Sequence, residues 1–119
     1  MRFHDYFEYH ADLRPRVPFL MQGDRVVDFA QAEAIANRIA NAMIAAGLQV
    51  GDRIAYLGKN SIEYALVYIA ASKAGVAPIP LNFRLAPKEW EYIVNHSGSR
   101  ALFVTAEYLD GIDSIRPEL

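Results

Sequence analysis

Two short apolar runs, residues 19–21 and 26–27, flank a polar segment at residues 22–25. The segment reads Gln-Gly-Asp-Arg, which is typical of a turn, so the pattern predicts a small β-hairpin. Asp28 follows at once, and Gln31 lies three residues later. Each of these side chains can accept a hydrogen bond from the backbone amide of the other, as in a capping box. We therefore predict that a helix begins here.

The helix after Asp28 has one apolar stripe. Polar residues occupy most of the remaining positions, so the pattern predicts a helix that buries one face. The stripe positions recur at spacings of three and four, and they are Ala32, Ile35, Ala36, Ile39, Ala40 and Met43. Gly47 can adopt the left-handed conformation that commonly ends a helix, so we expect the helix to stop there.

The chain then alternates between strand and helix patterns. Residues 53–57 are apolar on both faces, which is typical of a parallel strand covered by helices. Asn60 can cap the next helix with Glu63 as its third residue, and Gly75 can end it. The interior of this helix, residues 64–71, is apolar around its whole circumference, which indicates burial on more than one side.

Residues 76–81 form the next predicted strand. Pro78 and Pro80 each lack a backbone N–H, which favours an edge strand, a bulge or an early end, and predicts a short ladder. A third helix should begin at Pro87, and residues 101–105 form the last clear strand. The apolar face of the third helix consists of Trp90, Ile93 and Val94, and its end is expected at Ser97-Gly98.

This order of elements predicts an α/β fold. Alternating strands and helices imply parallel strands joined by right-handed crossovers. We therefore expect a parallel β-α-β-α-β sheet flanked by helices, preceded by the N-terminal hairpin and helix. After the last strand, residues 106–119 are amphipathic, but Gly111 and Pro117 limit any helix there. A length of 119 residues fits one globular domain or part of one.

Composition narrows the classes of partner. The 12 basic and 14 acidic residues are scattered without a basic block, so nucleic acid and anionic membranes are not expected partners. Charged residues among the first sixteen argue against a secretory signal, and the longest charge-free run, residues 39–51, is too short to span a membrane. The absence of cysteine excludes disulfides and thiolate metal sites and is compatible with the cytoplasm.

Several segments resemble parts of active sites without completing one. Residues 58–61, Gly-Lys-Asn-Ser, lack the spacing of a Walker loop, so a capped loop is favoured over an anion site at the helix start. No G-x-G-x-x-G motif is present, and adjacent His96 and Ser97 lack a nucleophile elbow. Glu89 and Glu91 point to different sides of their helix. The histidines lack the spacing of metal ligands, and they are His4, His10 and His96. We therefore predict neither a catalytic residue nor a metal site.

Arg84 is the one charged residue at a position that suits ligand binding. It follows a predicted strand, and open α/β sheets bind ligands at the carboxyl ends of their strands. A guanidinium group there suits a phosphate. The alternative is a surface ion pair or an anchor for the loop, and sequence position alone favours this alternative.

The motifs PLNFRLAP-x-E at residues 80–89 and YI-x-N-x-SG at residues 92–98 follow the sequence KNSIEYALVYIAASKAGVAPI. Together with the helix sequence VDFAQAEAIANRIANAMIAAGL, they resemble the N-terminal region of ATP-dependent acyl-CoA synthetases of the adenylate-forming superfamily. The resemblance covers residues 28–105. Two positions differ from the family pattern: Ala86 occurs where a Ser or Thr helix cap is common, and Pro78 falls within a strand.

The resemblance implies a two-step ligation in a larger parent enzyme. ATP would activate a carboxylic acid, expected to be a long- or medium-chain fatty acid, as an acyl-adenylate, and CoA would then displace AMP. The parent would use ATP, magnesium and CoA. Residues 1–119 would form the N-terminal portion of its AMP-binding domain, with the AMP-binding motifs and a C-terminal lid domain downstream. This segment is therefore expected to be inactive and to hold no cofactor of its own.

The resemblance also makes Arg84 a candidate contact for a CoA phosphate. The main expected partner is the remainder of the same polypeptide, and an isolated segment should expose the helix around residues 64–71 and self-associate. The expected location is the cytoplasm, with the parent peripheral to a membrane. Two alternatives stay open. One is a self-contained α/β binding or assembly domain without catalysis, and the other is a superfamily member with an acceptor other than CoA.

Overall fold

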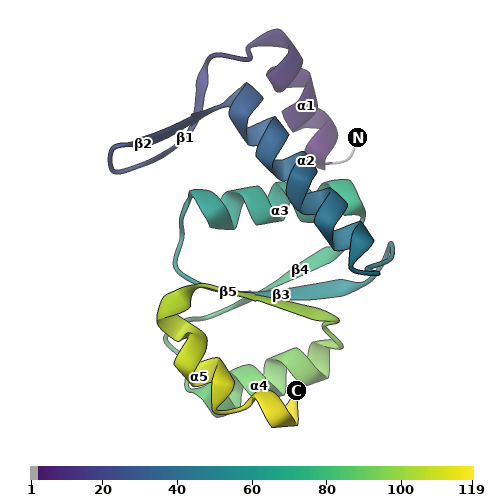
Figure 1. Ribbon diagram of the computed structural model, residues 1–119, viewed down its shortest axis with the longest axis vertical. Coiled ribbons are helices and arrows are strands. Elements are labelled where there is room, and N and C mark those ends of the chain that lie inside the picture. The colour runs from purple at the N-terminus through teal and green to yellow at the C-terminus, as the bar shows by residue number, and fades with distance from the viewer. Residues whose placement is uncertain (1–2) are drawn as a thin grey trace. The chain divides into compact units, whose positions relative to one another are not determined.

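The computed structural model describes residues 3–119, except for the side chain of Tyr6 (Figure 1). The chain forms two compact units. The helical unit extends to residue 50 and includes residues 60–76, and the sheet unit comprises residues 51–59 and 77–119. The polypeptide therefore passes from one unit to the other after residues 50, 59 and 76.

The helical unit contains helices and one hairpin in its described part. Its elements are α1 (Phe3–Leu13), β1 (Pro18–Gln22), β2 (Arg25–Asp28), α2 (Phe29–Ala45) and α3 (Ile62–Ala74). The two strands pair antiparallel on either side of Gly23, whose φ of +58° is left-handed. The predicted hairpin is thus confirmed, and α1, α2 and α3 contact one another behind it.

The capping box predicted at the start of α2 is present. The Gln31 amide donates to Asp28 Oδ1 at 2.7 Å, and the Asp28 amide donates to Gln31 Oε1 at 3.0 Å. Four of the six predicted stripe positions are buried, Ala32, Ala36, Ala40 and Met43, while Ile35 and Ile39 are half-buried. The helix ends at Ala45, just before Gly47, whose φ is +98°. The pattern therefore gave both ends and the buried face of α2.

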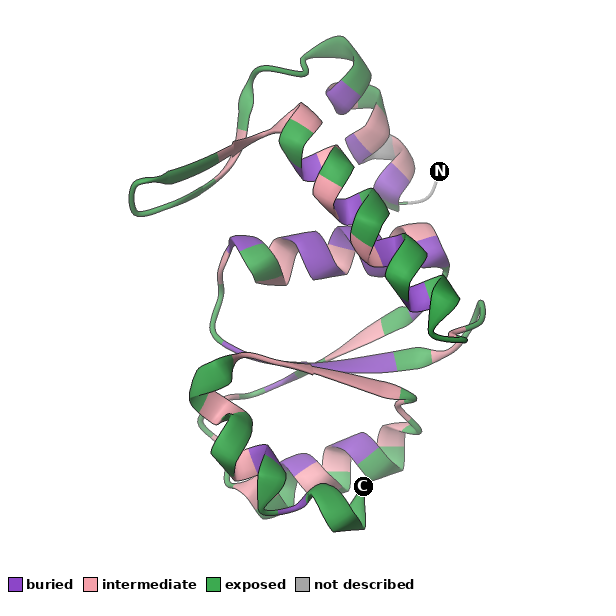
Figure 2. Cartoon of the chain, viewed as in Figure 1, coloured by how far each residue is buried: buried purple, intermediate pink, exposed green. Residues whose placement is uncertain are grey.

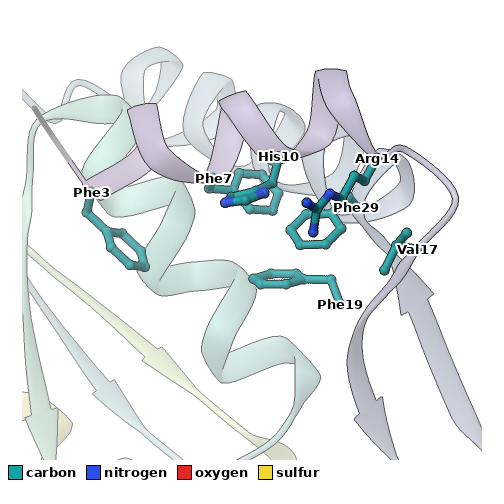
Figure 3. Close-up of a pocket in the computed structure, with 7 residues that line it drawn as sticks. All are labelled: Phe3, Phe7, His10, Arg14, Val17, Phe19 and Phe29. Atoms are coloured by element: carbon teal, nitrogen blue, oxygen red, sulfur yellow. The ribbon is translucent and has the colours of Figure 1, made fainter.

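α1 was not expected from the sequence pattern. Its buried residues His4, Phe7 and Ala11 recur at spacings of three and four, which was the available signal. Charged residues between these positions obscured it. Phe7 packs against Phe19 of β1 and Phe29 of α2, with ring centroids 5.1 and 6.0 Å away (Figure 3). The aromatic contacts join α1 to the start of the hairpin and of α2.

The cap of α3 differs from the prediction by one residue. Ser61, rather than Asn60, is the N-cap, and its Oγ accepts a hydrogen bond from the Tyr64 amide at 3.1 Å. The next free amide, that of Ile62, donates to Gln22 Oε1 in the hairpin at 3.1 Å. Because this second contact is tertiary, it was invisible in the local sequence. Gly75 ends the helix in the left-handed conformation, as predicted.

Replacing Ser61 with alanine should lower the free energy of unfolding by about 1 kcal/mol, because the Tyr64 amide loses its acceptor. Asn60→Ala is the matched control and should change stability by no more than about 0.5 kcal/mol, since Asn60 is exposed outside the helix. Urea unfolding followed by circular dichroism measures both variants. A larger loss for Asn60→Ala than for Ser61→Ala would restore Asn60 as the cap.

The sheet unit contains a parallel three-stranded sheet. Its strands are β3 (Arg53–Leu57), β4 (Ala77–Leu81) and β5 (Ala101–Val104), in the order β4-β3-β5. The other elements are α4 (Pro87–Ser97), η1 (Ala106–Tyr108), α5 (Leu109–Asp113) and η2 (Arg116–Glu118). The predicted α/β fold with β-α-β-α-β connectivity is confirmed, and the last segment forms only short helices, as expected from Gly111 and Pro117.

β4 accommodates its two prolines at the edge of the described sheet. It pairs with β3 in regular register over its whole length, from Ala77 opposite Arg53 to Leu81 opposite Leu57. The Ala77 amide donates to Asp52 O at 2.8 Å. Since amides alternate in direction along a strand, Pro78 and Pro80 fall on the side away from β3. Of the predicted alternatives, an edge, a bulge or an early end, the edge is observed within the described sheet, whereas the predicted short ladder is wrong.

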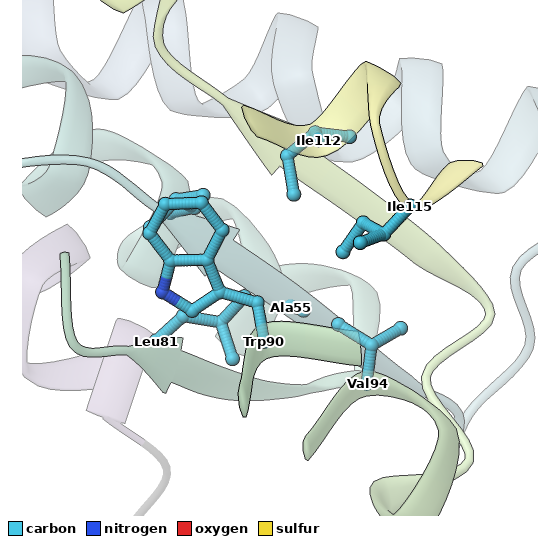
Figure 4. Packing of buried hydrophobic residues seen from close by; sticks show 7 residues of the cluster. Ala55, Leu81, Trp90, Val94, Ile112 and Ile115 are labelled. Carbon is cyan, nitrogen blue, oxygen red and sulfur yellow. The ribbon is translucent and has the colours of Figure 1, made fainter. Parts of the chain in front are cut away.

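The core of the sheet unit lies between the strands and the helices that follow them. Its buried members are Ala55, Leu57, Leu81, Trp90, Val94, Ile112 and Ile115 (Figure 4). Figure 2 colours the buried stretches of β3, α4 and α5 purple. α4 begins without a side-chain cap at Ala86, and Glu89 Oε1 accepts only weakly from the Ala86 amide at 3.4 Å. The Trp90 indole therefore anchors the start of α4 through packing.

Candidate functional site

Charged and aromatic side chains gather where the three parallel strands of the sheet unit end. Lys59 follows β3, the loop after β4 carries the next three, and the last two belong to η1 after β5. We name this set the carboxyl-end cluster, and its members are Lys59, Asn82, Phe83, Arg84, Glu107 and Tyr108. Ligands of open α/β sheets bind at this edge.

The loop after β4 is held by hydrogen bonds around Asn82. Asn82 Oδ1 accepts from the Arg84 amide at 2.9 Å, and Asn82 O accepts from the Leu85 amide at 3.1 Å. The same carbonyl accepts from Trp90 Nε1 at 2.9 Å. The loop conformation is thus fixed from within and from α4, while the Arg84 side chain remains exposed.

Two cations lie near the ring of Phe83. Arg84 Cζ is 5.3 Å and Lys59 Nζ is 5.7 Å from the ring centroid, within the range of cation–π contact. Lys59 also forms an ion pair with Glu107 at 3.6 Å, but both side chains are more than half exposed, so this pair is weak. Phe83 in turn lies against Tyr108, with centroids 6.0 Å apart. The arrangement can attract an anion to this edge of the sheet.

Arg84 has the position predicted for it, at the carboxyl end of its strand. Within the described residues it forms no ion pair, whereas the other alternative, an anchor for the loop, and the contact with a phosphate both stay predictions. Lys59 was interpreted as part of a capped loop and not as a site residue. Its signal was available in the sequence, because it follows β3 much as Arg84 follows β4. The contact of both with Phe83 depends on strand order and could not be read from the sequence.

Gly58 precedes Lys59, and a steric reason explains why glycine occupies position 58. A Cβ atom built there would lie 2.7 Å from Cγ2 of Thr105, the residue that follows β5. Real Cβ atoms do not approach other carbons this closely, so Gly58 permits the close approach of two strand ends. Residues 58–61 thus serve as a tight exit from β3 and a cap for α3.

The histidines considered in the sequence are separately engaged. His4 is 4% exposed, and its Nδ1 lies 2.8 Å from Ser72 Oγ in α3. His4 Nε2 lies 3.6 Å from Asp5 Oδ1, too far for a hydrogen bond, so these residues do not form a Ser-His-Asp relay. His96 stacks on Tyr92. Within residues 3–119, no three metal-ligating side chains gather at one point.

The two glutamates of α4 have different partners. Glu89 Oε1 accepts from the backbone amide of Ala86, whereas Glu91 pairs with Lys88 at 3.5 Å. They therefore do not share a proton.

No helix in the described part of the chain is long and apolar enough to cross a bilayer.

Known proteins resemble this chain over nearly its whole length. Residues 7–119 match the family described as AMP-binding enzyme. The chain belongs to the AMP-binding enzyme family. The resemblance seen in the sequence is thereby confirmed.

Two relatives of this chain are named as ligases. A fatty acid–[acyl-carrier-protein] ligase, ScoC of Streptomyces coeruleorubidus, is 39% identical over 84% of this chain and 19% of its own length. The long-chain-fatty-acid–CoA ligase FadD13 of Mycobacterium tuberculosis is 39% identical over 91% of this chain and 22% of its own length. The chain thus spans about a fifth of the length of the curated relatives it matches.

A solved structure confirms the fold of the AMP-binding enzyme segment. The anthranilate CoA ligase AuaEII, crystallised with anthranoyl-AMP, is 30% identical to this chain. It superimposes with a TM-score of 0.95 over 100% of this chain and 23% of its own. A likeness this close supports the order and type of the elements described above.

A buried lysine joins the three helices of the helical unit. Lys73 of α3 has a side chain only 7% exposed, and its Nζ lies 2.5 Å from a carboxylate oxygen of both Glu8 in α1 and Glu33 in α2. Burial works to lower the pKa of Lys73, but the hydrogen bonds to Glu33 and Glu8 outweigh it, so the pKa is raised. The group links the three helices, and Lys73 Nζ also lies 5.9 Å from the ring centroid of Phe7.

Two tyrosines of α3, Tyr64 and Tyr68, pack against each other. The rings of Tyr64 and Tyr68 stack with centroids 4.9 Å apart, and their hydroxyls are hydrogen-bonded at 3.2 Å. Burial, followed by the hydrogen bond to Tyr68, raises the pKa of Tyr64 to about 12. Tyr64 is therefore neutral in the physiological range and suits a packing role.

Proposed function

We propose that this chain is the N-terminal portion of an ATP-dependent acid–thiol ligase. The intact enzyme would activate a carboxylic acid as an acyl-adenylate and transfer the acyl group to a thiol. The observation that carries the proposal is the family match over residues 7–119, and it is supported by ScoC, FadD13 and AuaEII, which are each named as a ligase of a carboxylic acid.

We further propose a fatty acid as the carboxylate and CoA as the thiol. The two relatives at 39% identity are named as ligases of fatty acids, which supports the first choice. ScoC is named for an acyl-carrier protein and AuaEII for anthranilate, so a carrier protein and an aromatic acid are the competing substrates. Relative rates with octanoate, palmitate and anthranilate, each with CoA or a carrier protein, distinguish these cases.

Residues 1–119 would act as a scaffold and be inactive alone. Within residues 3–119, no three metal-ligating side chains gather at one point, which is compatible with this role. We propose that ATP and magnesium bind to residues beyond this segment. The carboxyl-end cluster is the part of the segment that would touch a substrate.

Within that cluster we propose that Arg84 contacts a phosphate of CoA. Its guanidinium is exposed, has no ion pair among the described residues, and rests on the ring of Phe83 at 5.3 Å. A guanidinium held in this way loses little freedom when it binds a phosphate. Lys59 would add a second, weaker attraction, because Glu107 already neutralises part of its charge.

Arg84→Ala in the intact enzyme should raise the KM for CoA about tenfold, which corresponds to one exposed charge-assisted hydrogen bond. The KM values for ATP and the carboxylate should stay within about twofold, since the loss is confined to the thiol substrate. Steady-state release of AMP measures all three. Arg38→Ala, an exposed arginine on α2, is the matched control and should change none of them. An unchanged KM for CoA in Arg84→Ala would refute the contact.

The competing proposal is a self-contained α/β binding or assembly domain. The isolated ligase segment should self-associate, because large apolar side chains are exposed on it, among them Met21 (73%), Val50 (85%) and Tyr92 (64%). The expected surface differs from the one inferred from sequence, since residues 64–71 of α3 are buried or half-buried. Sedimentation of residues 1–119 decides: a compact monomer without bound hydrophobic dye favours the self-contained domain.

The ligase itself is tested by its products. Incubation of the intact polypeptide with ATP, magnesium, a fatty acid and CoA should yield AMP, pyrophosphate and acyl-CoA in equal amounts. Release of ADP and phosphate instead would indicate a kinase-like activation and contradict the proposal.

We also propose that the enzyme works in the cytoplasm, peripheral to a membrane, and fractionation of cells tests this location.

A further inference from the structure

The helical unit contains a pocket that no part of the ligase proposal uses. Its volume is about 440 Å³, within the range of about 300–1,000 Å³ usual for small-molecule sites. The pocket is lined by Phe3, Phe7, His10, Arg14, Val17, Phe19 and Phe29 (Figure 3). All of these residues belong to α1, the loop after it, β1 and the start of α2, so the pocket lies within one unit.

The walls of the pocket are aromatic and already packed together. The rings of Phe19 and Phe29 stack with centroids 4.6 Å apart, and Phe7 lies 5.1 Å from Phe19. His10 lies 5.9 Å from Phe29. Contacts among the rings fix their positions before any ligand arrives, and a preformed apolar wall of this kind suits a hydrocarbon group.

One end of the pocket carries a positive charge. Figure 3 shows Phe3 at one end of the row of side chains and Arg14, with Val17, at the other. Arg14 is exposed and has no ion pair among the described residues, whereas Arg16, two residues later, pairs with Asp28 at 3.8 Å. A single available guanidinium at the end of an apolar trough suits a ligand with one anionic end.

The backbone around Arg14 is held in place. The Arg14 amide donates to His10 O at 2.8 Å, and the Phe29 amide donates to Val17 O at 3.2 Å. The Ala30 amide also donates to Pro15 O at 3.0 Å. These bonds tie the loop to α1 and to the first turn of α2, so the backbone that carries Arg14 keeps its place relative to the rings.

We propose that this pocket binds a monocarboxylate with a hydrocarbon chain, with the carboxylate at Arg14 and the chain along Phe19 and Phe7 towards Phe3. Binding here needs neither ATP nor a thiol and is independent of the ligase proposal. It would give the protein a second place for an amphipathic acid, separate from the carboxyl-end cluster of the sheet unit.

Octanoate titrated into residues 1–119 should bind with a Kd on the order of 1 mM, as expected for a ligand of this size. The largest NMR shifts should occur at the rings of Phe7, Phe19 and Phe29. Octylammonium should bind about tenfold more weakly, because it meets Arg14 with a like charge. Arg14→Ala should abolish the preference for octanoate, and Arg16→Ala, the matched control, should keep it.

A second measurement uses the intact polypeptide. A photoreactive analogue of octanoate should label peptides of α1 and β1, and excess octanoate should prevent the labelling. Arg14→Ala should reduce the labelling about tenfold while acyl-adenylate formation continues, which separates this site from the ligase. Two outcomes would overturn the proposal. One is that the NMR signals of the pocket rings do not shift at an octanoate concentration ten times the expected Kd, on the order of 10 mM. The other is that the Arg14→Ala and Arg16→Ala variants are photolabelled equally.

Discussion

Trp90→Ala is expected to lower the free energy of unfolding by about 4 kcal/mol. The indole is 4% exposed and lies within the core of the sheet unit, between the strands and α5 (Figure 4). Gly111 of α5 approaches it so closely that a Cβ there would lie 2.9 Å from Trp90 Cζ3. Because the packing around the ring is tight, the cavity left by alanine cannot close fully. Urea unfolding at neutral pH measures the loss.

Trp90→Phe separates the packing of the indole from its hydrogen bond. Phenylalanine fills much of the space but leaves Asn82 O without the donor that Trp90 Nε1 provides at 2.9 Å. The expected loss is about 1.5 kcal/mol, well below that of alanine. A loss of less than about 1 kcal/mol for Trp90→Ala would contradict the assignment of this residue to the core.

Lys73→Met is expected to lower the free energy of unfolding by about 2 kcal/mol. Removal of one partner from a buried ion pair costs about 3–5 kcal/mol, and the value here is reduced because Glu8 is 42% exposed and can regain water. The Glu33 carboxylate is only 24% exposed, so leaving it without a cationic partner accounts for most of the expected loss. Lys88→Met is the matched control, since Lys88 is 80% exposed and its removal should cost less than about 0.5 kcal/mol.

The stabilisation by Lys73 should also depend on pH. Its pKa in the folded chain is raised above the ordinary value of 10.5, so the contribution is complete below that value and is lost as the pH rises through the folded pKa. The difference in stability between the wild type and Lys73→Met should therefore be constant from pH 7 to about 9.5 and shrink only as the pH rises through the raised pKa of Lys73. Tyr64 titrates in the same range in both proteins, so its effect cancels. A difference that grows with pH would contradict the ion-pair account.

The parts of the fold that local residues determine were predictable from sequence. Asp28 and Gln31 form their capping box through each other, and Gly75 ends α3 by its own backbone conformation. The three strands followed from apolar runs between turn residues. The edge position of β4 followed from Pro78 and Pro80, because a missing N–H restricts a strand wherever it pairs.

The errors concern features that depend on distant residues. The N-cap of α3 is Ser61 rather than Asn60, and the adjoining Ile62 amide is satisfied by Gln22 from the hairpin. The β4 ladder is complete because both prolines face away from β3, which depends on which amides the neighbour strand uses. α1 was missed because its buried face, with Phe7 at the centre, takes its meaning from the rings it meets in other elements.

The candidate site was predictable only where it depends on local sequence. Arg84 was identified from its place after a strand, and strand ends are visible in a sequence. The contribution of Lys59 depends on β3 and β4 being neighbours, and the role of Phe83 depends on both cations reaching one ring. The aromatic pocket of the helical unit could not be predicted, because α1 supplies part of its lining and was itself not predicted.

Exchange of labelled pyrophosphate into ATP tests the central proposal most directly, because it reports acyl-adenylate formation without any thiol. With a fatty acid and magnesium, the intact polypeptide should catalyse the exchange, and purified residues 1–119 should remain at the background rate. Omission of the fatty acid should abolish the exchange. Exchange by residues 1–119 alone would contradict the scaffold role, and no exchange by the intact polypeptide with any carboxylate would contradict the ligase.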